Sequence, residues 1–282
     1  AYQNLVSFDS NGFTLGSTSS SNVINYASES HVAWNWKANG SGSSNEEGSI
    51  NTTSTSANTD AGFSISTYTG NETAGATIGH GLNETPELVI IKRRAGASNP
   101  WVVGSLQPLA SMDFTDAMYL DQSGAVIDIL GFFNDQAPSS TLVTIGDGAY
   151  VNAPSGTYVM YCWHSVEGYS KVGAYVGNGN ADGTFVYCGF RPKWVMVKRT
   201  DSTYEWMIKD SVRDTINPIK GLDNLYAENS TSEGNLDNST SNYVDFLSNG
   251  FKMRTSDNGT NATSPYLFYA IAETPFKNAN GR

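Results

Sequence analysis

The chain has 282 residues, of which 39% are hydrophobic, 12% aromatic and only 15% charged, so it can bury a sizeable core. Its 16 Lys and Arg residues stand against 27 Asp and Glu residues, giving a formal net charge of -11. This acidic balance argues against the broad positive surface that nucleic acids and anionic membranes require. Apolar runs span only a few residues, far short of the roughly 20 needed to cross a bilayer, so we expect no membrane insertion.

Short segments in which apolar and aromatic residues alternate with polar ones recur along the chain. They are rich in β-branched and aromatic types and are bounded by Gly, Asn, Ser and Pro, as is typical of strands. The clearest examples are residues 63–68, 158–163, 194–198 and 266–271. The best helical candidate is one short turn near residues 211–215. The pattern predicts an all-β fold.

Two stretches of the chain repeat each other. Residues 62–71 return as 168–178, and the phrase Pro-Glu-Leu-Val-Ile-Ile-Lys-Arg at 86–93 returns as Pro-Lys-Trp-Val-Met-Val-Lys-Arg at 192–199. Trp101 in the first stretch corresponds to Trp206 in the second. The offset stays between 105 and 107, so each unit is about 106 residues long, the size of one small β domain.

The second half of this unit occurs a third time. Residues 8–13 match 246–251, and residues 32–38 match both 158–164 and 266–272. We therefore expect residues 1–61 to be the C-terminal half of a β-sandwich unit. Half a unit cannot bury both faces of its strands, so its partner half lies upstream in a longer chain, the interpretation we favour, or a neighbouring chain completes it.

The remaining sequence divides into a first complete unit at 62–167 and a second at 168–282. The last unit contains roughly eight strand-like segments, near 168–176, 184–190, 193–200, 204–210, 223–228, 243–247, 250–255 and 265–272. Eight short strands in about 106 residues suggest a tandem of antiparallel, jelly-roll-like β-sandwiches. Polar loops at 39–44 and 227–242 decorate or join the units, the first as a hinge, and residues 177–180 predict a hairpin turn.

The repeated sequence motifs resemble those of a known group of proteins. They are Tyr-Thr-Gly-Asn at 68–71, Gly-Phe-Arg-Pro-Lys-Trp-Val-Met-Val-Lys-Arg at 189–199, Phe-x-Ser-Asn-Gly-Phe at 8–13, and Val-Ala-Trp-Asn-Trp-Lys-Ala at 32–38. Together they resemble repeat-containing virion proteins of tailed, mostly marine, bacteriophages, described as capsid decoration, spike or tail-associated proteins. The resemblance covers nearly the whole chain and brings no catalytic residues with it. Residues 266–272 depart from it by lacking the Trp and Lys, and Gly-Phe-x-Pro becomes Gly-Leu-Asn-Glu-Thr-Pro in the first complete unit.

Catalytic chemistry finds little support in the sequence. A glycosidase needs two carboxylates across a cleft, but Glu46 with Glu47, and Asp113 with Asp116, stand in polar stretches, and Glu167 suits a turn. A Ser-His-Asp hydrolase usually shows a Gly-x-Ser-x-Gly elbow, which is absent. The histidines are typical of turn or edge residues, and both they and the cysteines lack zinc-site spacing: His31, His80, His164, Cys162 and Cys188. We predict no catalytic or cofactor site and two free thiols.

Two binding alternatives stay open. Asn178, Asn180 and Asp182, or Asp257 with Asn258, offer oxygen ligands for calcium, but the same residues favour left-handed turns, and we prefer the turn interpretation. Cationic residues at strand ends, and aromatic residues near them, recur in both units. They could form a binding ridge, but we prefer to interpret them as ordinary features of a repeated fold. They are Lys92, Arg93, Arg94, Lys198, Arg199, Trp101 and Trp206. Exposed in a row, these and Trp34, Trp36 and Trp163 would form a platform for stacking sugars.

From these observations we expect a non-enzymatic virion structural protein, a capsid decoration or spike. Its partners would be other virion proteins and copies of itself, as a trimer by analogy with spikes in general, and its place the assembled particle. The alternative is a tail-fibre or receptor-binding adhesin that recognises host-surface glycan. No ligand-binding residue is assigned at this stage.

Overall fold

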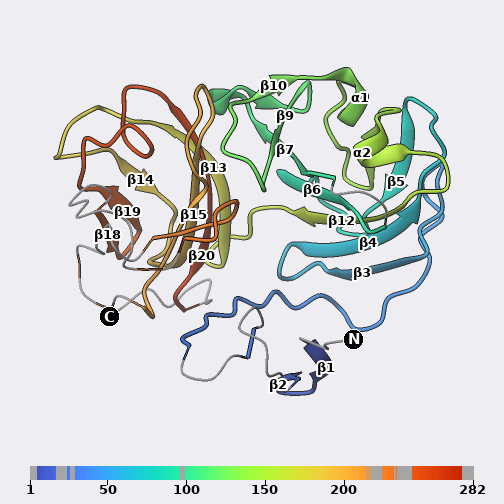
Figure 1. Cartoon of the computed structure of the whole chain (residues 1–282), viewed down its shortest axis with the longest axis horizontal. Coiled ribbons are helices and arrows are strands. Elements are labelled where there is room, and N and C mark those ends of the chain that lie inside the picture. Colours follow the sequence, from blue (N-terminus) through green and yellow to red (C-terminus); the bar gives the residue numbers. More distant parts are fainter. Residues whose placement is uncertain are drawn as a thin grey trace. The chain divides into compact units, whose positions relative to one another are not determined.

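A computed structural model describes residues 5–16, 24–25, 29–95, 99–213, 215, 217, 224–231, 233 and 243–274. The chain forms two compact units, residues 1–36 and residues 37–282. In the described part, no helix is long and apolar enough to cross a membrane. The sheets are antiparallel (Figure 1), and the expected all-β sandwich fold is confirmed.

The smaller unit contains one hairpin, formed by β1 (Leu5–Asp9) and β2 (Gly12–Leu15). Phe8 pairs with Phe13 across it, and the Phe8 side chain is 80% exposed. Residues 32–38 lie outside any strand, although both sequence matches of this segment form strands. A strand requires a partner for its backbone hydrogen bonds, and the complete units supply two neighbours at this position.

The larger unit begins with a sandwich of an eight-stranded and a two-stranded sheet. The order of the large sheet is β10 (Ile127–Asp128), β9 (Asp116–Tyr119), β7 (Trp101–Gln107), β6 (Leu88–Arg93), β12 (Thr157–Trp163), β4 (Phe63–Thr69) and β3 (Ser54–Asn58), with β8 (Met112–Asp113) also paired to β7. The small sheet pairs β5 (Ala76–Gly79) with β11 (Leu142–Ile145). Three short helices lie between the strands: η1 (Pro108–Ala110), α1 (Leu130–Phe133) and α2 (Ala149–Asn152).

The second sandwich repeats this topology with fewer strands. Its five-stranded sheet has the order β13 (Ser170–Val176), β20 (Pro265–Ala272), β15 (Pro192–Arg199), β16 (Met207–Asp210) and β17 (Leu225–Tyr226). Its three-stranded sheet has the order β14 (Phe185–Tyr187), β19 (Gly250–Met253) and β18 (Val244–Leu247). In both sandwiches the last long strand, β12 or β20, lies between the strand that opens the repeat and the Pro-anchored strand. The hairpin of β18 and β19 pairs Phe246 with Phe251, as β1 and β2 pair Phe8 with Phe13.

Each sandwich has its own core, because alternate residues of a strand face opposite sides of the sheet. In the first core Val89 and Met160 contribute to one cluster, and in the second Val195 and Phe268 contribute to another. The outward-facing residues of the two large sheets are buried as well: Leu88, Ile90, Val103 and Trp163 in the first sandwich, and Val172, Met196, Leu267 and Tyr269 in the second.

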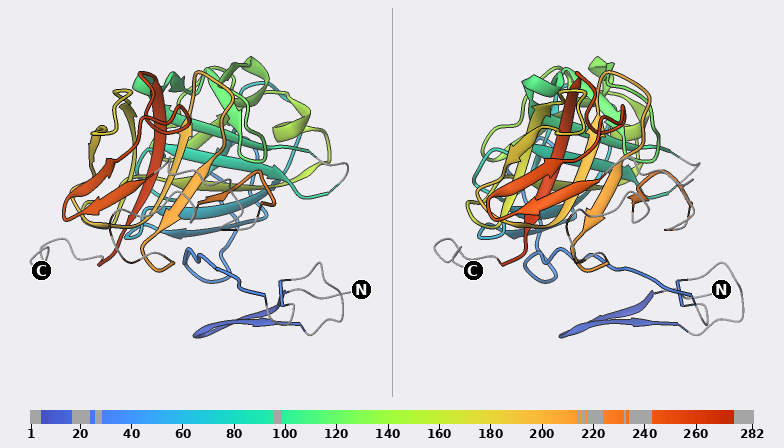
Figure 2. Two further views of the ribbon diagram at one scale, coloured as in Figure 1. Left: turned by 60° about the vertical axis from the view of Figure 1, so that its left-hand side comes forward. Right: turned by 90° about the vertical axis from the view of Figure 1, so that its left-hand side faces the viewer.

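These outer faces pack against each other. The rings of Trp163 and Tyr269 approach to 5.9 Å between centroids, and Trp163 is stacked on Phe63 at 5.1 Å. In Figure 1 the five-stranded sheet lies between the three-stranded sheet and the first sandwich, and in the right-hand view of Figure 2 the strands of the second sandwich lie in front of those of the first. The two sandwiches therefore share a third apolar layer, between their own cores.

Several expectations about local structure need correction. The units divide after Trp36, since residues 39–58 are bonded to the first sandwich: Ser56 Oγ donates to the Gly40 carbonyl at 2.9 Å, and β3 extends the large sheet. The loop at 39–44 is thus not a free hinge. Residues 177–180 form no hairpin, because β13 and β14 belong to different sheets. Residues 211–213 form a turn, whereas most of 227–242 lies outside the described residues.

Candidate functional site

A buried joint closes one end of the second sandwich, where the loop after β13 meets the loop before β20. Tyr175 and Tyr266 are stacked at 4.9 Å between ring centroids. The Tyr175 hydroxyl donates to the Thr260 carbonyl at 2.6 Å, and the Tyr266 hydroxyl accepts a hydrogen bond from the Ala262 N–H at 2.8 Å. Burial raises the pKa of Tyr266 to about 12. The two phenols therefore act as fixed hydrogen-bonding groups.

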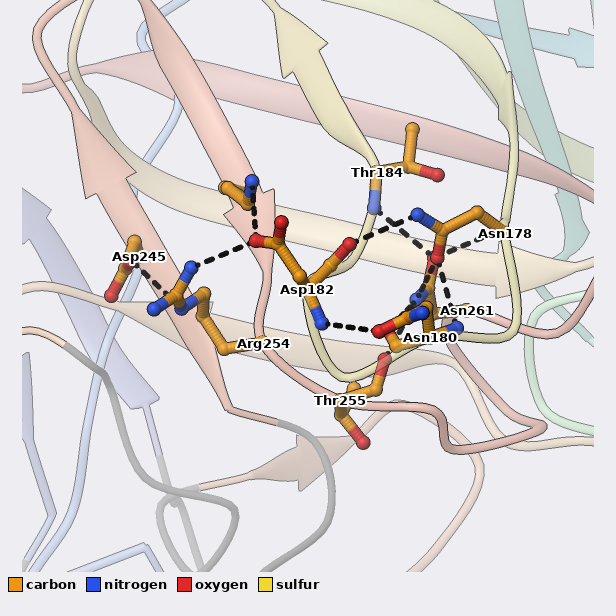
Figure 3. A network of polar contacts seen from close by, with 9 residues as sticks. Asn178, Asn180, Asp182, Thr184, Asp245, Arg254, Thr255 and Asn261 are labelled. Atoms are coloured by element: carbon orange, nitrogen blue, oxygen red, sulfur yellow. Dashed lines mark hydrogen bonds and ion pairs between the residues drawn. The ribbon is translucent and has the colours of Figure 1, made fainter.

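Asn261 is the centre of this joint (Figure 3) and is fully buried. Its Nδ2 lies 2.9 Å from Asn178 Oδ1, 2.9 Å from the Asn180 carbonyl and 2.7 Å from the Thr255 carbonyl. Its Oδ1 accepts from the Asn178 N–H at 3.2 Å and the Thr184 N–H at 3.4 Å. One amide thereby satisfies backbone groups of two loops, between β13 and β14 and between β19 and β20, that have no strand partner there.

The first sandwich contains the same joint. Tyr68 and Tyr158 are stacked at 5.1 Å, and the Tyr68 hydroxyl donates to the Val151 carbonyl at 2.7 Å. Asn152 takes the place of Asn261: its Nδ2 donates to the Gly146 carbonyl at 2.8 Å, and its Oδ1 accepts from the Asn71 N–H at 2.8 Å. We call these two sites the tyrosine–asparagine joints.

A glycine in each repeated Tyr-x-Gly-Asn phrase is required by this close packing. A Cβ atom on Gly70 would lie 2.4 Å from the Ala153 carbonyl oxygen, and one on Gly177 would lie 2.0 Å from that of Ala262. Both contacts are with backbone, which cannot rotate away as a side chain can. The repeated phrase is therefore explained by the geometry of the joint.

The side-chain oxygens of Asn178, Asn180 and Asp182, which were considered for calcium, contact protein donors (Figure 3). Asn178 Oδ1 accepts from the Asn180 N–H at 3.0 Å, and Asn180 Oδ1 accepts from the Asp182 N–H at 2.9 Å. The Asp182 carboxylate pairs with Lys252 at 2.8 Å and Arg254 at 3.3 Å, and the hydrogen bond from Lys252 lowers its pKa. Across the described residues no group of three His, Cys, Asp or Glu side chains is placed to hold a metal ion. The contacts of Asn178, Asn180 and Asp182 are thus those of residues that stabilise a turn.

A groove of about 460 Å³ opens along one side of the second sandwich, between the edge strands β13 and β14. Its lining includes Gly173 and Phe268 of the five-stranded sheet and Phe185 and Tyr187 of β14. Lys171 reaches over the Tyr187 ring, with Nζ 5.5 Å from the centroid. Glu87 and Gln107 of the first sandwich line one end. We call this cavity the edge groove; its volume lies within the range of small-ligand pockets.

Comparison with known protein families assigns the chain to one of them. A family model described as "Domain of unknown function (DUF7483)" matches residues 1–275. The chain belongs to the DUF7483 family. No curated protein and no solved structure matches it.

The carboxylates singled out from sequence in this DUF7483 chain differ in their contacts. The Thr115 hydroxyl lies 2.6 Å from Asp113 Oδ1 and 3.1 Å from Asp116 Oδ2. This hydroxyl lowers the pKa of Asp113, whereas burial raises that of Asp116. Glu47 accepts a hydrogen bond from Asn45 Nδ2 at 3.1 Å, and Glu46 and Glu167 are exposed.

The histidines of the larger DUF7483 unit contact backbone. His80 is fully buried; its Nδ1 accepts from the Leu82 N–H at 3.2 Å and its Nε2 lies 3.3 Å from the Ser139 carbonyl. Burial lowers the pKa of His80 to about 4, so the ring is neutral at pH 7. His164 Nδ1 lies 2.9 Å from the Ser165 carbonyl.

The repeated Lys and Trp residues occupy different environments in the two sandwiches. Lys92 Nζ lies 5.3 Å from the ring centroid of half-buried Trp101. Lys198 is fully buried, with Nζ 2.6 Å from the Arg199 carbonyl and 3.2 Å from the Ser123 carbonyl. Desolvation lowers the pKa of Lys198 to about 8. Its neighbour Trp206, 1% exposed, donates from Nε1 to the Tyr119 carbonyl at 2.9 Å.

These residues do not form an exposed row. Trp163 and Trp206 are buried, and in the smaller unit Trp34 and Trp36 are half-buried. The prediction of free thiols is confirmed: Cys162 and Cys188 are buried, unbridged and members of different core clusters. Burial raises the pKa of both thiols, that of Cys188 to about 12.

Sequence reasoning missed the two central asparagines as a pair. Asn152 and Asn261 are both followed by Ala and then, five or six residues after the Asn, by the tyrosine of the next strand. The loops between these positions differ, so the match is short. The edge groove was also missed, because it depends on which strand lies at the edge of a sheet.

Proposed function

We propose that this chain is a non-enzymatic structural protein of a phage virion, a capsid decoration or spike built from repeated β-sandwiches. The observation that carries this proposal is the structural role of the repeated sequence motifs. Two of the phrases on which the resemblance to virion proteins rests have structural roles: residues 68–71 help to build a tyrosine–asparagine joint, and residues 189–199 include the Pro-anchored strand β15. A sequence signature used for scaffolding fits a protein that acts through shape and surface contacts.

The connection between the sandwiches supports the same proposal. Besides the Trp163–Tyr269 contact, the Val126 N–H donates to the Thr200 carbonyl at 2.8 Å, and the Tyr204 N–H donates to the Ser123 carbonyl at 3.0 Å. Trp206 bonds to Tyr119 at the end of β9, and Lys198 bonds to Ser123 in the loop that follows β9 in the first sandwich. The tandem is held by hydrogen bonds as well as apolar contact, which suits a rigid element of a particle surface.

The proposal is tested by locating the chain on purified particles. Gold-labelled antibodies raised against residues 37–282 are applied to virions of the phage that encodes the chain, with particles of an unrelated phage as control. Label over the head or at a spike is the expected result. Particles that carry neither label nor peptides of the chain by mass spectrometry would refute the proposal.

Two parts of the proposal have separate tests. Self-association, with a trimer as the expected state, is measured by sedimentation equilibrium of the purified chain, and a monomer throughout the accessible concentration range would contradict it. The adhesin alternative requires label confined to the tail together with binding to a host glycan. Because Trp163 and Trp206 are buried, they do not form the exposed row of tryptophans that this alternative predicted, so we do not adopt it.

A further inference from the structure

The edge groove of the second sandwich corresponds to an opening that the first sandwich closes with its own chain. In the first sandwich residues 43–58 run along the gap between β4 and β5, the counterparts of β13 and β14. Ile50 forms a bridge to Ile78 of β5 and belongs to the buried core, while β3 pairs with β4. The second sandwich begins directly after residues 165–169, and among its described residues no such segment pairs with the free edge of β13 or β14.

The closing segment satisfies backbone groups on both edges of the opening. The Ile50 N–H donates to the Thr77 carbonyl at 3.0 Å, and the Thr77 N–H donates to Ser49 Oγ at 2.9 Å. On the other edge, the Thr53 N–H donates to the Thr67 carbonyl at 2.7 Å. An edge strand exposes such groups unless something covers them, and here the chain covers them itself.

The equivalent groups of the second sandwich face the edge groove. Ala174 precedes Tyr175 as Thr67 precedes Tyr68. The N–H of Val172, two residues before Ala174, donates to Ser165 Oγ. The carbonyl of Val176, two residues after Ala174, accepts from Thr184 Oγ1. Both groups point away from β20. By the alternation of an antiparallel strand, the N–H and C=O of Ala174 point the same way.

The same reasoning applies to β14. Phe185 corresponds to Thr77, because Val186 and Ile78 face the cores and pair with Phe251 and Val143. The carbonyl of Thr184 accepts from Met253 and the N–H of Cys188 donates to Asn249, both on the β19 side. The backbone of Phe185, between them, therefore points away from β19, into the gap.

We propose that the edge groove binds an extended segment of another protein, which adds as a strand to β13 and inserts one aliphatic side chain toward Gly173 and Phe268. Strand addition of this kind takes affinity from backbone hydrogen bonds and specificity from side-chain pockets. The first sandwich already holds a segment of this chemistry, with Ile50 as the aliphatic side chain and Ser and Thr residues around it. This binding goes beyond a structural role and does not depend on the virion proposal.

The occupant is a different protein and not a second copy of this chain. The segment of a second copy that has the required chemistry, residues 49–58, is bonded to its own first sandwich, with Ile50 only 7% exposed. The groove also differs from its counterpart: Tyr187 stands where the first sandwich has Gly79, and Lys171 where it has Ser64. The wall formed by Tyr187 and Lys171 offers contacts that the first sandwich lacks, so a partner sequence that uses them binds more tightly than the chain's own segment, which supplies the same backbone groups and aliphatic side chain.

The test uses the intact chain and a fluorescent synthetic peptide with the sequence of residues 48–58, followed by anisotropy. Hydrogen exchange with and without peptide locates the site. A second peptide carries an N-methyl group at Thr53, whose N–H bonds to the neighbouring strand in the first sandwich. The control peptide carries it at Thr55, whose N–H points to the Ser43 carbonyl at 2.6 Å, away from β4. Because only the peptide changes, folding of the protein is not affected.

We expect saturable binding below about 1 mM, protection of residues 171–176 and 184–187 from exchange, and a loss of about tenfold or more in affinity on methylation at Thr53 but not at Thr55. Absence of saturable binding would overturn the proposal, as would equal effects of the two methyl groups or protection elsewhere. Concentration-dependent self-association that protects residues 171–187 without peptide would reassign the groove to a second copy. Binding of a glycan there, with the peptide inactive, would reassign it to a sugar.

Discussion

Replacing Asn261 by Ala should destabilise the larger unit more than most single substitutions do. The change removes two N–H donors that lie 2.9 and 2.7 Å from the Asn180 and Thr255 carbonyls, and an acceptor 3.2 Å from the Asn178 N–H. Each such hydrogen bond contributes about 1 kcal/mol net, so the loss is about 3 kcal/mol. For a unit of this size that corresponds to a melting temperature lower by roughly 6–12 °C.

The matched control is Asn180→Ala in the same loop. The Asn180 side chain is exposed and its Oδ1 accepts one hydrogen bond, from the Asp182 N–H at 2.9 Å, so we expect a loss of at most about 1 kcal/mol. Urea unfolding followed by tryptophan fluorescence gives both free energies of unfolding. If Asn261→Ala lies within about 0.5 kcal/mol of Asn180→Ala, the joint does not stabilise the fold and our account of the repeated phrase is wrong.

Three further outcomes are expected. Gly177→Ala should lower the melting temperature sharply, because its Cβ would lie 2.0 Å from a backbone oxygen, whereas Gly124→Ala, with nothing within 4 Å, should not; equal effects in calorimetry would contradict this. Phe246→Ala should cost about 3–5 kcal/mol in urea unfolding, and Phe8→Ala, whose ring is 80% exposed, less than about 0.5 kcal/mol; similar costs would show that Phe8 is covered. Burial lowers the pKa of His80 to about 4, so the unfolded state is protonated before the folded state as the pH falls from about 6.5 to 4, and the free energy of unfolding should decrease by up to about 3 kcal/mol. The variant His80→Gln, compared by urea unfolding at both pH values, should lose less stability over this window. An equal loss would refute the assignment.

The sequence was sufficient for the fold class and the duplication because both depend on local alternation and on repeated phrases. The paired strands opening with residues 63 and 170 and the Pro-anchored strands emerged directly from these patterns. The hairpin expected at residues 177–180 failed for a physical reason. Gly and Asn specify a tight turn, but not whether the next strand returns to the same sheet or crosses to the facing one.

The candidate site was less accessible from sequence for a related reason. The edge groove consists of ordinary residues, such as Gly173 and Phe185, and is open because no segment in the described part of the second repeat covers it. Likewise Lys92 and Lys198 look equivalent in sequence, although Lys92 lies over the Trp101 ring, whereas Lys198 is buried among carbonyl groups, one of which, that of Ser123, belongs to the neighbouring sandwich. Such differences arise from tertiary contacts that no local pattern encodes.

The packing of the two large sheets has a consequence for growth of the array. Solenoid repeats can be added indefinitely because each presents one face to the previous repeat and a different face to the next. Here both repeats use the same face, around Trp163 in one and Tyr269 in the other, and after this contact neither has that face left. The duplicated sandwiches thus form a closed pair, and any further repeat of this kind must join through an edge or a loop.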